Sequence, residues 1–311
     1  STQGVSSAAS DVYKRQNLLF SLLLLLSVAI QCVFGNFPFD FFAFPLDAIV
    51  ALLWIALLWY GYKELRTSAV IRILLAPSST RWTLGWFLAG CLIIGLFPQL
   101  SVREAAEKQG LFSLLGCYNF MSSWIFVTGL FGLLTHLGLI TLRRCFTPGR
   151  KRWRFLLNHA GLWLALFSGF LGSASEQTLR IPVFRDAPNN EAFTSKGERV
   201  FLDKPLQLTG FTVEHYDNGT PRYFFAEISL DGKPVHLEVN HPYSRGWGED
   251  YYLTSYDVQS PEPAYCVVQI VREPLKYVML VGIVMMLCGG FLLFLEGPEK
   301  QNKSQSFRRI D

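Results

Sequence analysis

Residues 277–295 read YVMLVGIVMMLCGGFLLFL, a run without a single Asp, Glu, Lys, Arg or His. A helix needs about 20 apolar residues to cross the hydrocarbon core of a bilayer, so this run predicts a membrane span. Other segments have the same character, and together they give these candidate spans: 17–35, 46–62, 82–97, 122–142, 155–171 and 277–295. The segment 82–97 is the shortest and weakest of them. We therefore predict a polytopic α-helical membrane protein with about six spans.

The composition agrees with a bilayer environment. Of 311 residues, 50% are hydrophobic and 17% are charged, against about 25% charged in a soluble domain. The charges gather between the apolar segments, because an ionised side chain at the bilayer centre costs roughly 2.5–3.5 kcal/mol. The net charge of +4 lies mostly in short loops. We read it as topology information and not as a nucleic-acid-binding surface.

The start of the chain needs separate treatment. Residues 1–16 are small and polar without a pattern, which predicts a disordered or non-native tail. Segment 17–35 follows Lys14 and Arg15, as a secretory signal sequence would. Its apolar core is long for a signal peptide and no small-x-small cleavage site follows it cleanly, so we interpret it as a retained span.

Basic residues occupy alternate connections between the spans. They lie after spans two, four and six: Lys63, Arg66, Arg72, Arg81; Arg143, Arg144, Arg150, Lys151, Arg152, Arg154; Lys300, Lys303, Arg308, Arg309. By the positive-inside rule both termini are cytoplasmic, and the long segment 172–276 lies on the outer side. The predicted organisation is a tail (1–16), two N-terminal spans (17–81), core spans (82–171), an outer domain (172–276), a last span (277–296) and a cytoplasmic tail (297–311).

The outer segment has the pattern of an antiparallel β domain. Residues 211–215 alternate apolar and polar side chains, and Asp217-Asn218-Gly219 is a hairpin signal. Further short strands are expected at 223–230, 235–239, 251–256 and 265–271. Short strands joined by tight turns predict a small sandwich or barrel.

Two of the five histidines lie inside predicted spans, where ionisable residues are functional candidates. His136 and His159 fall at similar depth near the inner boundary. They could share one metal or porphyrin iron, or each could bind iron separately. The alternative is a neutral imidazole that hydrogen-bonds a backbone carbonyl or a neighbouring helix. Outside the membrane, His241 precedes an aromatic-rich stretch that suits either a flat apolar ligand or ordinary strand packing.

The cysteines carry no recognisable motif. None of the six forms CxxC or CxxCH, which argues against a zinc site, a thioredoxin-like dithiol and a covalent haem-attachment site. Cys32, Cys117 and Cys266 are expected on the outer side, where a disulfide is chemically allowed; the sequence does not select a pair. No nucleophile with its base, phosphate loop or paired carboxylates is evident, so no catalytic residue is predicted.

From Trp82 onward the chain resembles the ResB family of cytochrome c biogenesis proteins. The resemblance rests on ordered pieces rather than one motif: Gly95-Leu-Phe-Pro98-Gln99, Ser122-Ser123-Trp124-Ile-Phe126, Leu142-Arg143-Arg144, Asn158-His159-Ala160-Gly161, Phe211-Thr-Val-Glu-His215, Val239-Asn240-His241-Pro242 and Val267-Val268-Gln-Ile-Val271-Arg272-Glu273-Pro274. Spans one and two are extra relative to the usual four-span pattern, and Glu273 stands where the family has Asp. His136 stands where the family commonly has a polar non-histidine residue.

The resemblance implies a membrane subunit of a system II cytochrome c maturation complex in a bacterial inner membrane. Its cargo would be haem b, bound transiently, and its partners would be a ResC/CcsA-like subunit, apocytochrome c and in some settings a thiol-reducing protein. Only His159 matches the family's haem-binding histidine; His136 and His241 remain further candidates. Alternatives are a non-catalytic receptor or scaffold, a transporter and a metal-dependent hydrolase. The last two are weakened because the spans hold no acidic residue besides Asp47, at the edge of 46–62, and because no His/Glu/Asp cluster is evident.

Overall fold

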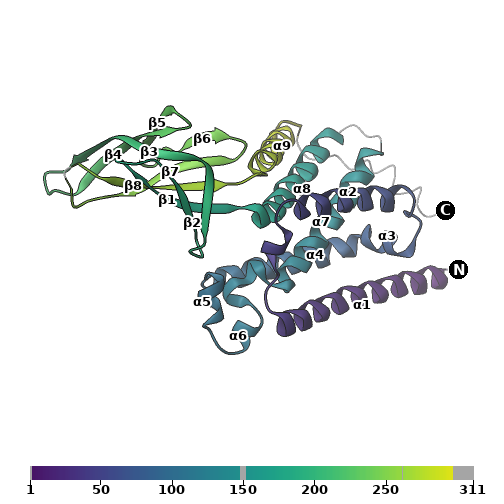
Figure 1. The fold of residues 1–311 in the computed structure, drawn as a ribbon. Coiled ribbons are helices and arrows are strands. Elements are labelled where there is room, and N and C mark those ends of the chain that lie inside the picture. The colour runs from purple at the N-terminus through teal and green to yellow at the C-terminus, as the bar shows by residue number, and fades with distance from the viewer. Residues whose placement is uncertain (1, 148–151, 261, 297–311) are drawn as a thin grey trace. The chain divides into compact units, whose positions relative to one another are not determined.

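The computed structural model describes residues 2–147, 152–260 and 262–296. The chain divides into two compact units (Figure 1). The first comprises residues 1–167 with 278–311 and is helical; the second comprises residues 168–277 and is built on a β-sheet. The predicted tail at 297–311 lies outside the described residues.

Among the described residues, six helices are long and apolar enough to cross a membrane: α1 (Thr2–Phe34), α2 (Leu46–Lys63), α4 (Pro77–Leu96), α7 (Trp124–Cys145), α8 (Arg152–Ser175) and α9 (Lys276–Glu296). Shorter helices lie between them: α3 (Ala69–Leu74), α5 (Val102–Ala106) and α6 (Leu111–Leu114), with the 3-10 turns η1 (Phe39–Phe42) and η2 (Cys117–Ser122). These helices and the antiparallel sheet confirm the predicted combination of elements, and they suggest a multi-pass membrane protein.

Helix α7 is the centre of the helical unit. It packs against α1, α2 and α4, and more of it is buried than of any other candidate span. Glycines on α7 make room for two indole rings. Trp86 lies against Gly129 and donates to the carbonyl of Ile125 at 3.0 Å, while Trp163 lies against Gly138. Close backbone approach at small residues is the usual way that membrane helices pack.

The prediction that segment 82–97 forms the shortest span is wrong. Helix α4 has 20 residues, and α2, with 18, is the shortest of the six. Proline at the first helical position begins α4 at Pro77, ahead of the apolar run. The polar first turn is buried because Ser78 and Ser79 both hydrogen-bond the side chain of Gln16 on α1. A hydropathy profile counts these serines as polar although their hydrogen bonds are satisfied within the helical unit, so it underestimates the length of this helix.

The start of α1 also differs from expectation. The helix begins at Thr2 and includes residues 2–16, for which the sequence predicts a disordered or non-native tail. Gln16 is fully buried, and besides the two serines its amide donates to the carbonyl of Ile73 at 3.3 Å. This residue therefore belongs to the packed helical unit.

The β unit is one eight-stranded antiparallel sheet with strand order β5-β4-β3-β2-β1-β8-β7-β6. Its strands are β1 (Gln177–Phe184), β2 (Asn189–Thr194), β3 (Arg199–His215), β4 (Pro221–Leu230), β5 (Lys233–Glu238), β6 (Tyr243–Gly246), β7 (Glu249–Tyr256) and β8 (Tyr265–Arg272). Strand β5 also contacts β6 and β7, so the sheet is rolled and its two ends approach each other. The rolled sheet agrees with the predicted sandwich or barrel.

Alternate side chains of the strands fill the interior of the roll. The core contains Leu179, Ile181, Leu208, Ile228 and Ile270, all at most 1% exposed. The predicted turn at 217–219 is present, with Gly219 at φ +80°. A second tight turn joins β4 and β5, where Asp231 and Gly232 both have positive φ. At the base of the unit, Gln177 pairs with Arg272, so the first and last strands are neighbours.

Candidate functional site

A cavity of about 700 Å³ lies beside His159 in the helical unit. It is lined by residues near the end of α7, by the first turns of α8 and by Leu293 of α9. The polar residues of its lining are Arg143, Arg144, Thr147, Arg154, Asn158 and His159. A cavity of this size falls in the range of 300–1,000 Å³ that is typical of small-molecule sites.

The imidazole of His159 has one engaged and one open nitrogen. Its Nδ1 lies 3.0 Å from the carbonyl oxygen of Phe155, one turn earlier on α8. Because a carbonyl only accepts, Nδ1 carries the proton and Nε2 of the neutral ring keeps its lone pair. No described residue hydrogen-bonds Nε2. A metal-binding histidine uses this arrangement, with the second nitrogen fixed by a backbone carbonyl.

The arginines make the cavity positively charged. The guanidinium of Arg144 lies 5.8 Å from the centre of the Phe155 ring. Its Nε is buried and has no hydrogen-bond partner among the described residues. A buried donor without a partner is costly, by about 1–3 kcal/mol. The cavity therefore suits an anionic ligand whose oxygens accept from Arg144 and whose metal reaches His159.

Close packing against α9 holds this part of α8. A Cβ added at Gly161 would lie 2.7 Å from the carbonyl oxygen of Gly282, and one at Gly289 would lie 2.6 Å from the amide nitrogen of Asn158. Asn158 also donates to the carbonyl of Arg154 at 3.0 Å. The motif Asn158-His159-Ala160-Gly161 thus uses its first and last residues to seat the helix and His159 to line the cavity.

His136 has a different environment. It is 2% exposed, and both ring nitrogens are engaged: Nδ1 lies 2.6 Å from the carbonyl oxygen of Leu74 and Nε2 lies 2.8 Å from the hydroxyl of Thr80. The ring therefore donates to the end of α3 and accepts from α4. It does not line the cavity beside His159. This geometry favours the interpretation of His136 as a helix-linking residue, because no lone pair is left for iron.

His241 is an exposed residue in the β unit. Its side chain is 75% exposed, and Nδ1 lies 3.5 Å from a carboxylate oxygen of Glu238. The aromatic residues that follow it do not form one platform. Trp247 is 90% exposed, Tyr251 is 2% exposed, and Tyr256 packs on Phe211 and Phe224. Ordinary strand packing accounts for most of the aromatic density that the sequence shows.

The stretch that contains His159 and His241 is similar to a known protein family. A model of the ResB-like family matches residues 149–264, just over a third of the chain. These residues are similar to the ResB-like family. A search of the curated proteins finds no match. The ResB-like family is associated with cytochrome c biogenesis, and the ResB-like segment begins just ahead of α8 and runs through β7.

Sequence reasoning missed the arginines as site residues. It used Arg143, Arg144 and Arg154 only to orient the spans, whereas the structure places all three beside the histidine of the ResB-like segment. The contact between Phe155 and His159, in contrast, could be predicted from the sequence, because residues four apart lie on the same face of a helix.

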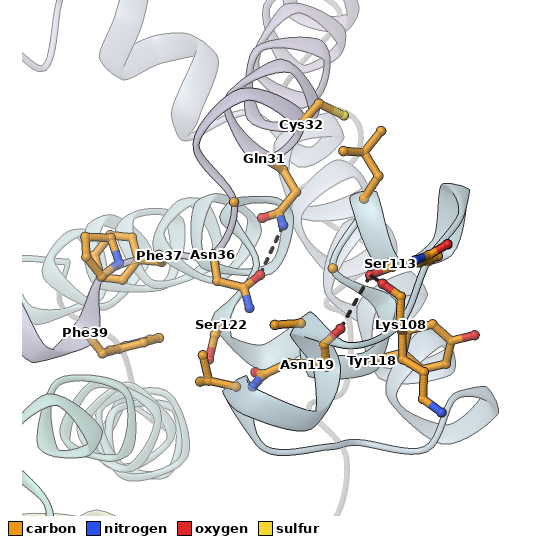
Figure 2. Close-up of a pocket in the computed structure, with 18 of the residues that line it drawn as sticks. Gln31, Cys32, Asn36, Phe37, Phe39, Lys108, Ser113, Tyr118, Asn119 and Ser122 are labelled. Carbon is orange, nitrogen blue, oxygen red and sulfur yellow. Dashed lines mark hydrogen bonds between the residues drawn. The ribbon is translucent and has the colours of Figure 1, made fainter. Parts of the chain in front are cut away.

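A second cavity, of about 740 Å³, lies in the helical unit where α1 ends (Figure 2). Its wall is held by amide side chains. Gln31 donates to Asn36 at 3.1 Å and accepts from the backbone N–H of Trp124 at 2.9 Å. Cys32 also lines it and forms no disulfide among the described residues. In the part of the chain that the structure describes, no three His, Cys, Asp or Glu side chains come together as a metal site.

Proposed function

We propose that the protein is a membrane subunit of a system II cytochrome c maturation complex that binds haem b as transient cargo. The observation that carries the proposal is the open Nε2 of His159 in a cavity lined by three arginines. Haem combines an iron that accepts an imidazole nitrogen with two carboxylates at one edge. In the cavity, the open Nε2 of His159 suits the iron and the arginines suit the carboxylates.

Each residue has a defined task in this proposal. His159 supplies the axial nitrogen, and the Phe155 carbonyl fixes its tautomer. Arg144, whose Nε is buried without a partner, binds a propionate, with Arg143 and Arg154 as neighbouring cations. No residue is assigned a catalytic role, so the chain acts as an accessory subunit of the haem lyase. His136, whose two ring nitrogens are both engaged, and the exposed His241 are given no part in haem binding.

The partners follow from this task. A ResC/CcsA-like subunit would take haem onward, and apocytochrome c would receive it; a thiol-reducing protein would keep the apocytochrome cysteines reduced. We place the protein in a bacterial inner membrane with both termini cytoplasmic and the β unit on the outer side. The alternation of basic connections supports this orientation.

The test is an absorption spectrum of the full chain purified with its partner subunit. The wild type should show a Soret band, and His159→Ala should lose most of it. His136→Phe is the matched control, because it removes a second intramembrane imidazole outside the cavity; it should retain the band. A colourless wild-type complex, or equal spectra for wild type and His159→Ala, would refute the proposal. Either result would favour a non-catalytic receptor or assembly scaffold.

A further inference from the structure

A third cavity, of about 750 Å³, runs along the length of α4 in the helical unit. It is largely apolar. Gly85 and Ala89 lie along it, both exposed, and a Cβ added at Gly85 would meet no atom within 4 Å. It extends from Ser78 and Arg81 at the start of α4 to Ile93 near its end.

Two tryptophans line the cavity, and each is held by a hydrogen bond to a different helix. Trp82 donates to Asn17 of α1 at 2.8 Å and stacks on Phe20, with ring centres 5.8 Å apart. Trp86 instead donates to the carbonyl of Ile125 on α7 at 3.0 Å. Because both rings are tied to other helices, the groove over Gly85 and Ala89 is a built feature of the fold.

The two ends of the groove differ in chemistry. Arg81 lies at one end, is exposed and has no ion-pair partner among the described residues. The other end is formed by Ile93, Phe120 and Ile125. From Arg81 to Ile93 the helix rises about 18 Å at 1.5 Å per residue. One leaflet of the hydrocarbon core is about 15 Å thick, half of about 30 Å.

We propose that this groove binds an anionic glycerophospholipid, with one acyl chain over Gly85 and Ala89 and the phosphate beside Arg81. A cation at the depth of the first helical turns meets a headgroup, whereas the apolar remainder matches the length of one acyl chain. Gly85 and Ala89 would also admit a partner helix. The unpaired Arg81 favours the lipid, because a headgroup supplies the missing negative charge.

Native mass spectrometry of the full chain in detergent tests the proposal. Dioleoylphosphatidylglycerol should bind with higher occupancy than dioleoylphosphatidylcholine, and Arg81→Gln should reduce that preference about fivefold. Gly85→Leu should abolish binding of both lipids, since the added side chain fills the groove. It should still fold, because space is open there.

The chain offers matched controls. Gly95→Leu places the same side chain at another open glycine of α4 outside the groove, and Arg103→Gln removes an exposed arginine of α5. Both should leave lipid occupancy unchanged. Equal lipid binding by Gly85→Leu and Gly95→Leu would overturn the proposal. So would release of a co-purified membrane subunit by Gly85→Leu without any loss of lipid, which would identify a helix as the occupant.

Discussion

The imidazole of His159 lies flat on the ring of Phe155, with ring centres 3.7 Å apart and planes inclined by 10°. The backbone carbonyl of Phe155 also accepts a hydrogen bond from Nδ1 of His159. Phe155 therefore sets both the tilt of the histidine ring and its tautomer. A side-chain substitution removes the first of these effects and leaves the second.

Replacing Phe155 with leucine removes the stack on His159, together with the ring beside the Arg144 guanidinium, and leaves the backbone hydrogen bond in place. We expect haem affinity to fall about 2- to 12-fold, the equivalent of about 0.5–1.5 kcal/mol for an aromatic pair. The measurement is a haem titration of the purified chain. Phe155→Tyr keeps an aromatic ring and should bind nearly as the wild type does. Equal affinity for Phe155→Leu and wild type would show that the stack does not position the ligand.

Arg144 is predicted to recognise the carboxylates of the cargo. Arg144→Gln should weaken haem binding at least tenfold, because a charge-assisted hydrogen bond contributes about 1.5–3 kcal/mol. Haem dimethyl ester, which has no carboxylate, should bind both proteins equally. Arg103→Gln controls for a general loss of positive charge. If the ester also binds more weakly to Arg144→Gln, the arginine acts on the fold and not on the propionates.

His136 is predicted to stabilise the helical unit. His136→Phe leaves the Leu74 carbonyl and the Thr80 hydroxyl without their partner, which should lower the free energy of unfolding by about 1–3 kcal/mol. Thermal unfolding in detergent measures the change. Thr80→Val breaks only one of the two bonds and should have a smaller effect. Unchanged stability together with loss of haem would reverse the roles assigned to the two histidines.

A buried carboxylate predicts acid sensitivity of the β unit. Burial acts to raise the pKa of Asp250, but hydrogen bonds from Lys276 and Ser244 outweigh it and hold the pKa below its usual value. A depressed pKa in the folded state means that the stabilisation is complete above the unfolded pKa of about 3.9. It is lost as the pH falls through that range toward the folded pKa.

Asp250→Asn should therefore be less stable than the wild type at pH 7, by about 1–3 kcal/mol. The difference should shrink as the pH drops below about 4. Circular dichroism of the β signal during thermal unfolding, at several pH values, follows both proteins. Asp257→Asn is a control, since the Asp257 side chain accepts only a local bond from the backbone of Gln259. A constant gap between wild type and Asp250→Asn at all pH values would contradict the prediction.

Cys266 is predicted to report on unfolding of the β unit. It is completely buried in the core, and this burial raises the pKa of its thiol to about 12. Only the thiolate reacts with maleimides, so Cys266 should resist labelling at pH 7.5 until the unit unfolds. A chain in which the other cysteines are alanine provides the readout, and urea should produce the reaction. Rapid labelling without urea would show that the core is open to solvent.

Much of this architecture is readable from the sequence because each element has a local signal. Long apolar runs specify the six helices, and alternation with tight turns specifies β4, β5, β7 and β8. Strands β1 and β2 lack such a signal. Pro182 interrupts the pattern of β1, and β2 begins with Asn189 and Asn190. These strands are specified by pairing with other strands, and for β1 the partner β8 is about 90 residues away in the chain, so a short stretch of sequence does not reveal it.

The site was only half predictable for the same reason. His159 stood out because a histidine in an apolar helix is unusual. The resemblance selected His159, but the sequence did not show how the surroundings of His136 differ, since that difference lies in Leu74 and Thr80, which are distant in the chain. Likewise, Arg144 counted as a topology marker until the structure showed its guanidinium over Phe155 and its buried Nε without a partner among the described residues.

Helix α8 ends at Ser175 and β1 begins at Gln177, while β8 ends at Arg272 and α9 begins at Lys276. Because Gln177 and Arg272 are paired across the sheet, both covalent links to the helices leave the β unit at a single seam. A domain whose two chain ends lie close together is of the kind that tolerates insertion into another protein, so the β unit has the geometry of a domain inserted between α8 and α9.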